Sequence, residues 1–146
     1  VMLIRSGTEE NLEKKRELWK YIKDHDIRLY YNFAFGHLDG ENGKFDYTSQ
    51  KGRRYTMTVQ ADKKLDFEIL EGSENPIGGW ISYGYAWRKP IPQLIAKHSG
   101  KAPIHFITVL APEETKAETA INGNAAMVTL AGGKVLTLTE NAVELR

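Results

Sequence analysis

The sequence predicts a mainly β fold, an antiparallel β-sandwich with one N-terminal α-helix. Short runs of alternating apolar and polar residues recur from residue 27 to the C-terminal end, as in strands that turn one face to a core. Clusters of Gly, Pro, Asn, Asp and Ser separate these runs, as turns do. Only one segment, near the start, has the wider spacing of apolar residues that is typical of a surface helix.

The predicted helix extends from Thr8 to about His25. Ser6 or Thr8 can cap its first turn, and the interval from Ser6 to Glu9 is that of a capping box. The stripe of apolar residues beyond the cap is narrow and consists of Leu12, Leu18, Trp19 and Ile22. We therefore expect the helix to lie on the outside of a larger body.

The chain of 146 residues is long enough to bury one core without a metal or a disulfide. We expect residues 1–26 to supply an N-terminal strand and the helix, packed on the sandwich, and residues 27–146 to form the antiparallel β-sandwich, all as a single domain. The apolar start, Val1 to Ile4, is typical of the middle of a strand. We therefore expect this sequence to be a fragment of a longer chain.

The alternating runs predict a half-buried strand over residues 27–35, a turn-rich stretch over residues 37–43 and a short strand near Phe45. Further strands are expected at residues 55–60, 65–69, 80–88, 92–98, 104–110, 125–130, 134–139 and 142–145. Hairpin turns are expected at residues 61–64 and at Gly132-Gly133, a loop at residues 72–79, and a polar connection at residues 111–119. The run at residues 104–110 is apolar on both faces, so we expect both to be covered.

Composition excludes several classes of function. With 20 Lys and Arg against 19 Asp and Glu, the net charge of +1 provides no global field toward nucleic acid or an anionic membrane. The absence of Cys excludes disulfides, thiol nucleophiles and Cys-based zinc sites. No apolar run approaches the roughly 20 residues that cross a bilayer. From the low net charge and the lack of such a run, we predict neither a nucleic-acid nor a membrane partner.

Residues 78–92 combine four aromatic side chains with two cations. On one continuous strand, Ile81, Tyr83, Tyr85 and Trp87 would share a face. Such rings stack on sugar rings, and the cations can pair with carboxylate or sulfate groups. Aromatic residues are also frequent in strands for structural reasons alone, so both interpretations stay open. The candidate substrate-binding residues are Trp80, Tyr83, Tyr85, Trp87, Arg88, Lys89 and His37.

The same segment resembles the late part of heparinase II/III-like polysaccharide lyases. The resemblance lies in Gly79-Trp80-Ile81-Ser82, in Tyr83 to Tyr85, in Lys89-Pro90-Ile91-Pro92 and in the run from Pro103 to Pro112. It is close over residues 79–112 and looser from residue 27. The sequence differs from the family pattern in the longer spacing between Tyr83 and Lys89.

The resemblance implies β-elimination on an acidic polysaccharide by the parent chain, with a base, an acid and a group that neutralises the uronate. In the family these groups lie mainly on a helical domain and a His-rich strand, and neither pattern occurs here. We therefore expect no catalytic residue in this fragment, and a missing N-terminal helical catalytic domain as its partner. His37-Leu38 resembles a His-Leu of the family, which would place His37 near the cleft. A secreted or periplasmic location is also implied.

No metal and no cofactor are predicted. The four histidines are scattered singly, without metal-ligand spacing, and neither Gly78-Gly79 nor Gly132-Gly133 precedes a phosphate-binding helix. Two further functions remain open, a carbohydrate-binding module and a purely structural interdomain sandwich. Solvent exposure of Tyr83, Tyr85 and Trp87 distinguishes them.

Overall fold

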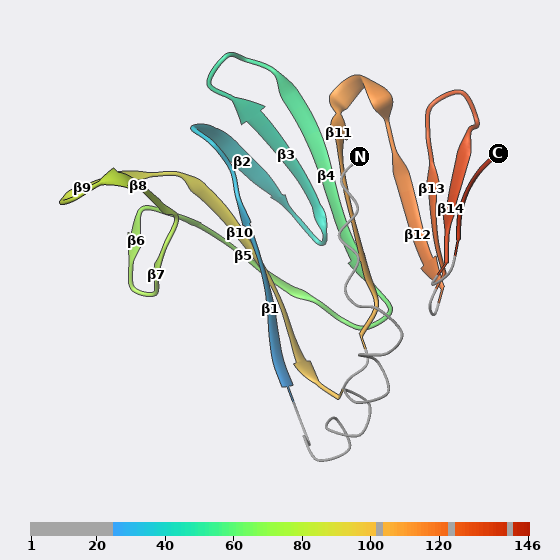
Figure 1. Ribbon diagram of the computed structural model, residues 1–146, viewed down its shortest axis with the longest axis horizontal. Helices are drawn as coiled ribbons and strands as arrows, with labels where there is room; N and C mark the ends of the chain where they lie inside the picture. The colour runs from blue at the N-terminus through green and yellow to red at the C-terminus, as the bar shows by residue number, and fades with distance from the viewer. Residues whose placement is uncertain (1–24, 102–103, 123–124, 140–141) are drawn as a thin grey trace.

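The computed structural model describes residues 25–101, 104–122, 125–139 and 142–146 (Figure 1). These residues form antiparallel strands and one short 3-10 helix, η1 (Glu113–Thr115), so the predicted mainly β, antiparallel class is confirmed for them. The predicted helix lies outside the described residues, apart from its last position, His25, which begins a strand instead. Within the described part, no helical segment has the length and hydropathy needed to span a membrane.

Fifteen strands are present in the described residues. They are β1 (His25–Asn32), β2 (Gly36–Glu41), β3 (Lys44–Ser49), β4 (Arg54–Ala61), β5 (Asp66–Glu71), β6 (Ser73–Glu74), β7 (Ile77–Gly78), β8 (Trp80–Gly84), β9 (Trp87–Pro90), β10 (Pro92–Gly100), β11 (Phe106–Pro112), β12 (Glu118–Asn122), β13 (Ala125–Thr129), β14 (Val135–Leu138) and β15 (Val143–Leu145).

The strands divide among three larger sheets and two small hairpins. The first sheet has the order β1-β10-β5, the middle sheet β11-β4-β3-β2 and the third sheet β12-β13-β14-β15, while β6-β7 and β8-β9 are two-stranded. The middle sheet lies between the other two in Figure 1. The expected arrangement of one two-sheet sandwich is therefore not seen, because the C-terminal strands pair only with one another and form a sheet of their own.

The larger apolar core joins the first sheet to the middle sheet. Leu94, on the central strand of the first sheet, is 0% exposed. From the middle sheet, Met57 and Val59 enter the same core, because alternate residues of β4 share a face. Its buried members are Phe33, Leu38, Phe45, Tyr47, Met57, Val59, Leu94 and Ala96.

A second core joins the middle sheet to the third. Ile107 and Val109 of β11 pack with Val128 of β13, and several half-buried apolar residues of the third sheet surround them. Between them Thr108 points the other way, where its Oγ1 lies 2.6 Å from the hydroxyl of Tyr31 on β1. The prediction that both faces of this strand are covered is therefore right for one face and wrong for the other. On the face of Thr108, the side chains of Phe106 and Leu110 are 37% and 39% exposed.

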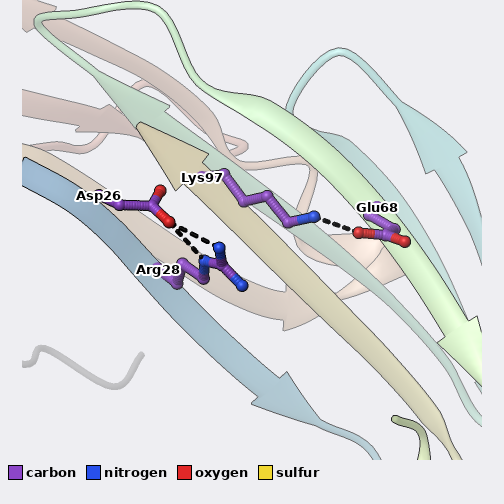
Figure 2. A network of polar contacts seen from close by, with 4 residues as sticks. All are labelled: Asp26, Arg28, Glu68 and Lys97. Atoms are coloured by element: carbon purple, nitrogen blue, oxygen red, sulfur yellow. Dashed lines mark hydrogen bonds and ion pairs between the residues drawn. The ribbon is translucent and has the colours of Figure 1, made fainter. Parts of the chain in front are cut away.

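Charged side chains occupy the outer face of the first sheet (Figure 2). Arg28 on β1 lies opposite Lys97 on β10 in the strand register. Two like charges in this position repel each other, but each has its own carboxylate. The Arg28 guanidinium is 2.6 Å from Asp26, and the Lys97 ammonium contacts Glu68 on β5. These carboxylates allow the two cations to lie side by side.

Residues 37–43, predicted as a turn-rich stretch, mostly form strand β2 instead. The turn is confined to Asn42 and Gly43, which both have positive φ, at 53° and 81°. A Cβ atom on Gly40 would lie 2.3 Å from the carbonyl oxygen of Lys44. Glycine is therefore required here by the close approach of β3, and the composition that resembles a turn belongs to a strand.

Residues 61–64 do not form the predicted hairpin turn. They lead from β4 in the middle sheet to β5 in the first sheet, so the strands on either side do not pair. By contrast, the predicted hairpin at Gly132-Gly133 is confirmed, with the Leu130 amide donating to the Lys134 carbonyl at 2.8 Å. Strand β12 overlaps the end of the predicted polar connection and was not expected, because its alternating residues are mostly small or polar.

Candidate functional site

The predicted strand over residues 80–88 is a hairpin. Strand β8 ends at Gly84, residues 85 and 86 form the turn, and Trp87 begins β9 opposite Gly84. Ala86 has a φ of 56°, a backbone conformation that residues other than glycine rarely adopt. The expectation that four apolar residues share one face was therefore wrong, because the turn interrupts the alternation at Tyr85. In Figure 1 the hairpin extends away from the three larger sheets.

The hairpin leaves the rest of the chain at Gly79, which is buried. The carbonyl of Gly79 accepts hydrogen bonds from the amides of Gly72 and Ile91, at 2.9 Å and 2.8 Å. Its φ is +69°, and a Cβ atom would lie 2.6 Å from the carbonyl oxygen of Leu70. Only glycine fits such a position without strain, so Gly79 sets the point and direction of departure.

One face of the hairpin, which we name the anchor face, carries Trp80 and Arg88. The Trp80 Nε1 donates a hydrogen bond of 2.9 Å to the carbonyl of Ser73. The Arg88 guanidinium lies 4.1 Å from the centre of the Trp80 ring, and its Nη2 is 2.6 Å from the Glu74 carboxylate. Both side chains therefore attach the hairpin to β6, and their polar groups are engaged within the chain.

The opposite face, which we name the aromatic face, carries Tyr83, Trp87 and Lys89. The rings of Tyr83 and Trp87 have centroids 5.2 Å apart and planes inclined at 46°. Tyr83 is 68% exposed and Trp87 39%, while Tyr85, in the turn beside this face, is 103% exposed. The rings are thus open to solvent but form an angled pair rather than a flat platform.

The Lys89 ammonium lies near two aromatic rings, one on this face and one outside the hairpin. Its Nζ is 5.3 Å from the centre of the Trp87 ring and 5.8 Å from that of Phe35, which precedes β2. Both distances are within the range of cation–π attraction. Among the described residues no carboxylate forms an ion pair with Lys89. Its charge therefore remains available to an anion from solution.

His37 is not part of the hairpin. It lies on β2, opposite Thr48 in the register, and is exposed. The structure therefore brings six of the seven candidate residues together on the hairpin, divided between its two faces, and leaves His37 on another sheet. The sequence pattern did not indicate the contributions of Phe35, Ser73 and Glu74, because these contacts depend on how separate strands pack.

The other histidine side chains that the structure describes lie apart from the hairpin. His98 is half-buried, and its Nδ1 is 2.9 Å from the carbonyl oxygen of Lys64. His105 lies before β11, where its ring Nδ1 and its backbone amide each lie 2.9 Å from an oxygen of Asp62. No group of three or more His, Asp or Glu that could hold a metal ion occurs among the described residues.

Among the described residues, four acid–base groups have a pKa that their surroundings shift. The hydrogen bond to Asp26 raises the pKa of Arg28. Burial raises the pKa of Tyr31, opposed by its hydrogen bond to Thr108, and burial together with the nearby Tyr55 raises the pKa of Tyr47. Burial acts to raise the pKa of Asp62, but hydrogen bonds from His105 and the charges of His105 and Lys63 outweigh it. The pKa of Asp62 therefore lies below its ordinary value.

No protein-family model matches the sequence, and neither a curated protein nor a solved structure matches the chain.

Proposed function

We propose that this chain is the C-terminal accessory β-sandwich of a heparinase II/III-like lyase, and that its β8–β9 hairpin contacts acidic polysaccharide. The observation that carries the proposal is the exposure of Tyr83 and Tyr85 beside a cation, Lys89, that has no carboxylate partner in the described part of the chain. Aromatic rings offer an apolar surface to sugar C–H groups, and an ammonium offers charge to a carboxylate or sulfate.

The resemblance in the sequence supports the lyase part of the proposal. Its closest stretch, residues 79–112, includes the whole hairpin and its buried glycine. On this proposal the first and middle sheets, which share the larger core, are the counterpart of the lyase sandwich, and the third sheet is an addition to it. The parent enzyme would be secreted or periplasmic, where acidic polysaccharides occur.

The proposal assigns no catalytic step to this chain. β-Elimination requires a base, an acid and a group that neutralises the uronate, all within hydrogen-bond reach of one sugar. Burial raises the pKa of both Tyr31 and Tyr47, which disfavours their phenolate forms. The proposal therefore assigns catalysis to a helical domain of the parent enzyme, and this chain would form one wall of the cleft.

The test compares binding and degradation by the same protein. The chain is titrated with heparan-type, chondroitin-type and alginate-type polymers and with a neutral dextran, while ultraviolet absorbance records any unsaturated product. We expect binding to acidic polymers without product. Replacing both Tyr83 and Tyr85 by Ala should weaken binding about tenfold, at roughly 0.5–1.5 kcal/mol for each ring.

A matched control is Tyr30→Ala, which removes a 53% exposed tyrosine from the outer face of the first sheet. This variant should bind as the unchanged chain does. Product formation by the chain alone, or equal affinity for dextran, would contradict the proposal. So would a parent gene that encodes no helical domain before residue 1.

A free-standing carbohydrate-binding module is the second candidate. It is favoured by Tyr85, which is 103% exposed in the turn of the hairpin, a position from which a ring can reach a polymer without help from another domain. The angle of 46° between the rings of Tyr83 and Trp87 speaks against a flat binding platform. Polymer binding combined with a parent gene lacking a helical domain would favour this candidate over the first.

A further inference from the structure

We infer that Lys89, rather than Arg88, is the cation that meets the anionic group of a bound saccharide, and that Arg88 is a positioning residue. The inference rests on the proposed function, since it assigns roles within the same hairpin. It starts from the observation that two cations adjacent in the sequence lie on opposite faces of the hairpin, with different partners.

Arg88 is engaged on the anchor face. Its guanidinium is 2.6 Å from the Glu74 carboxylate and stacks on the Trp80 ring at 4.1 Å. An incoming carboxylate or sulfate would have to displace Glu74 and would meet the negative charge of that side chain. The same contacts join β9 to β6, so the charge of Arg88 serves the attachment of the hairpin.

Lys89 has the opposite surroundings. The rings of Trp87 and Phe35 hold its ammonium by weak cation–π attraction and provide no hydrogen-bond acceptor on their faces. An exposed ammonium with no ion pair in the described residues keeps its three donors for an oxyanion. The two rings also restrict the side chain before binding, which lowers the entropy lost when an anion is bound.

Trp87 acquires a different role from the one expected. Lys89 lies near its ring and Tyr83 lies at 5.2 Å from it, which leaves Trp87 at 39% exposure. The ring surfaces that remain most open for stacking on a sugar are those of Tyr83 and Tyr85, at 68% and 103%. Trp87 therefore orients Lys89, while the two tyrosines provide the stacking surface.

The test measures the affinity of the chain for an alginate-type polyuronate and for a sulfated heparan-type polymer at several sodium chloride concentrations. The two polymers distinguish a carboxylate from a sulfate as the bound group. Lys89→Gln should weaken binding about fivefold, as expected for one exposed charge pair of up to about 1 kcal/mol. It should also reduce the dependence of affinity on salt, because one fewer counterion is released.

Three further variants complete the test. Lys89→Arg keeps the charge and should restore the affinity to within about twofold. Lys134→Gln removes one lysine charge from the turn between β13 and β14 on the third sheet. It should change neither the affinity for the polymers nor the dependence of that affinity on salt. Arg88→Gln should lower the melting temperature but leave the salt dependence unchanged, which distinguishes positioning from charge recognition.

The outcomes separate the inference from the proposed function. If the unchanged chain binds neither acidic polymer at any salt concentration, both fail. Two outcomes contradict the inference alone, in a chain that does bind. One is that Lys89→Gln binds as Lys134→Gln does, and the other is that Arg88→Gln, instead of Lys89→Gln, reduces the salt dependence. Near-ultraviolet circular dichroism of the tryptophans verifies that each variant keeps its hairpin.

Discussion

The hydroxyl groups of Tyr31 and Thr108 lie 2.6 Å apart and connect β1 of the first sheet to β11 of the middle sheet. The two residues are 77 positions apart in the sequence. Around them the larger core is apolar, and burial raises the pKa of Tyr31. The bond therefore pairs two polar groups that would otherwise lose water without gaining a partner.

Tyr31→Phe should lower the free energy of unfolding by about 1 kcal/mol, because it leaves the Thr108 hydroxyl without its partner. Urea unfolding of the two proteins measures the difference. Adding Thr108→Val removes the second hydroxyl with little change of shape. The double variant should therefore lose less free energy of unfolding than the two single variants lose in sum. Strict additivity of the losses would show that the bond contributes nothing to stability.

Leu94→Ala should lower the free energy of unfolding by about 3 kcal/mol. The side chain is 0% exposed on the central strand of the first sheet, so its removal leaves a cavity between two sheets that cannot fully close. Leu145→Ala is the control, since that side chain is 64% exposed on β15 and should change stability by no more than about 0.5 kcal/mol. Similar losses for both variants would contradict the assignment of the core.

The bond between Asp62 and His105 should make stability depend on acid pH. The pKa of Asp62 is lower in the folded chain than in the unfolded chain, where it is about 3.9. Its contribution is therefore fully present above pH ~4 and is lost as the pH falls through the lower, folded value.

Asp62→Asn removes the titrating carboxylate, so its stability should fall less steeply below pH ~4 than that of the unchanged chain. The measurement is the urea midpoint at a series of pH values between neutral and strongly acid. Asp46→Asn, on an exposed position of β3, serves as the comparison. The prediction is refuted if the urea midpoint falls equally steeply at acid pH in the Asp62→Asn variant and in the unchanged chain.

Gly79→Ala should destabilise the chain by more than about 1 kcal/mol and displace the hairpin. The added Cβ would lie 2.6 Å from the Leu70 carbonyl oxygen, in a backbone conformation with φ +69°. Thermal unfolding and tryptophan fluorescence together measure stability and the surroundings of Trp80. Gly84→Ala, in the same hairpin with no atom within 4 Å of the added Cβ, should have little effect.

Most of the strands could be predicted from alternation alone. Residues 27–35 show why, since every second side chain from Ile27 to Phe35 is buried or half-buried and those between them are exposed. The failures have specific causes. Gly40 resembles a turn residue but is required by the close approach of β3, and residues 61–64 resemble a hairpin turn although they connect two sheets.

The composition of the sequence indicated the segment of the candidate site, but it did not indicate the geometry of that segment. Rings and cations crowded into residues 80–89 indicate a special segment whatever its shape. A run of aromatic residues is equally compatible with one strand and with a hairpin, because both place alternate side chains on one face. The position of the turn was decided by a pairing between Gly84 and Trp87 that has no clear sequence signal.

By itself, the sequence determined the antiparallel β class, the approximate positions of most strands and the segment that carries the candidate binding residues. The tertiary structure decided how the strands divide among sheets, and it placed Arg88 against Glu74 and Lys89 near Trp87 and Phe35. The physical reason is that alternation is a local property, set by the pleat of a single strand. The partners of a side chain depend instead on segments far away in the chain, and only packing brings these together.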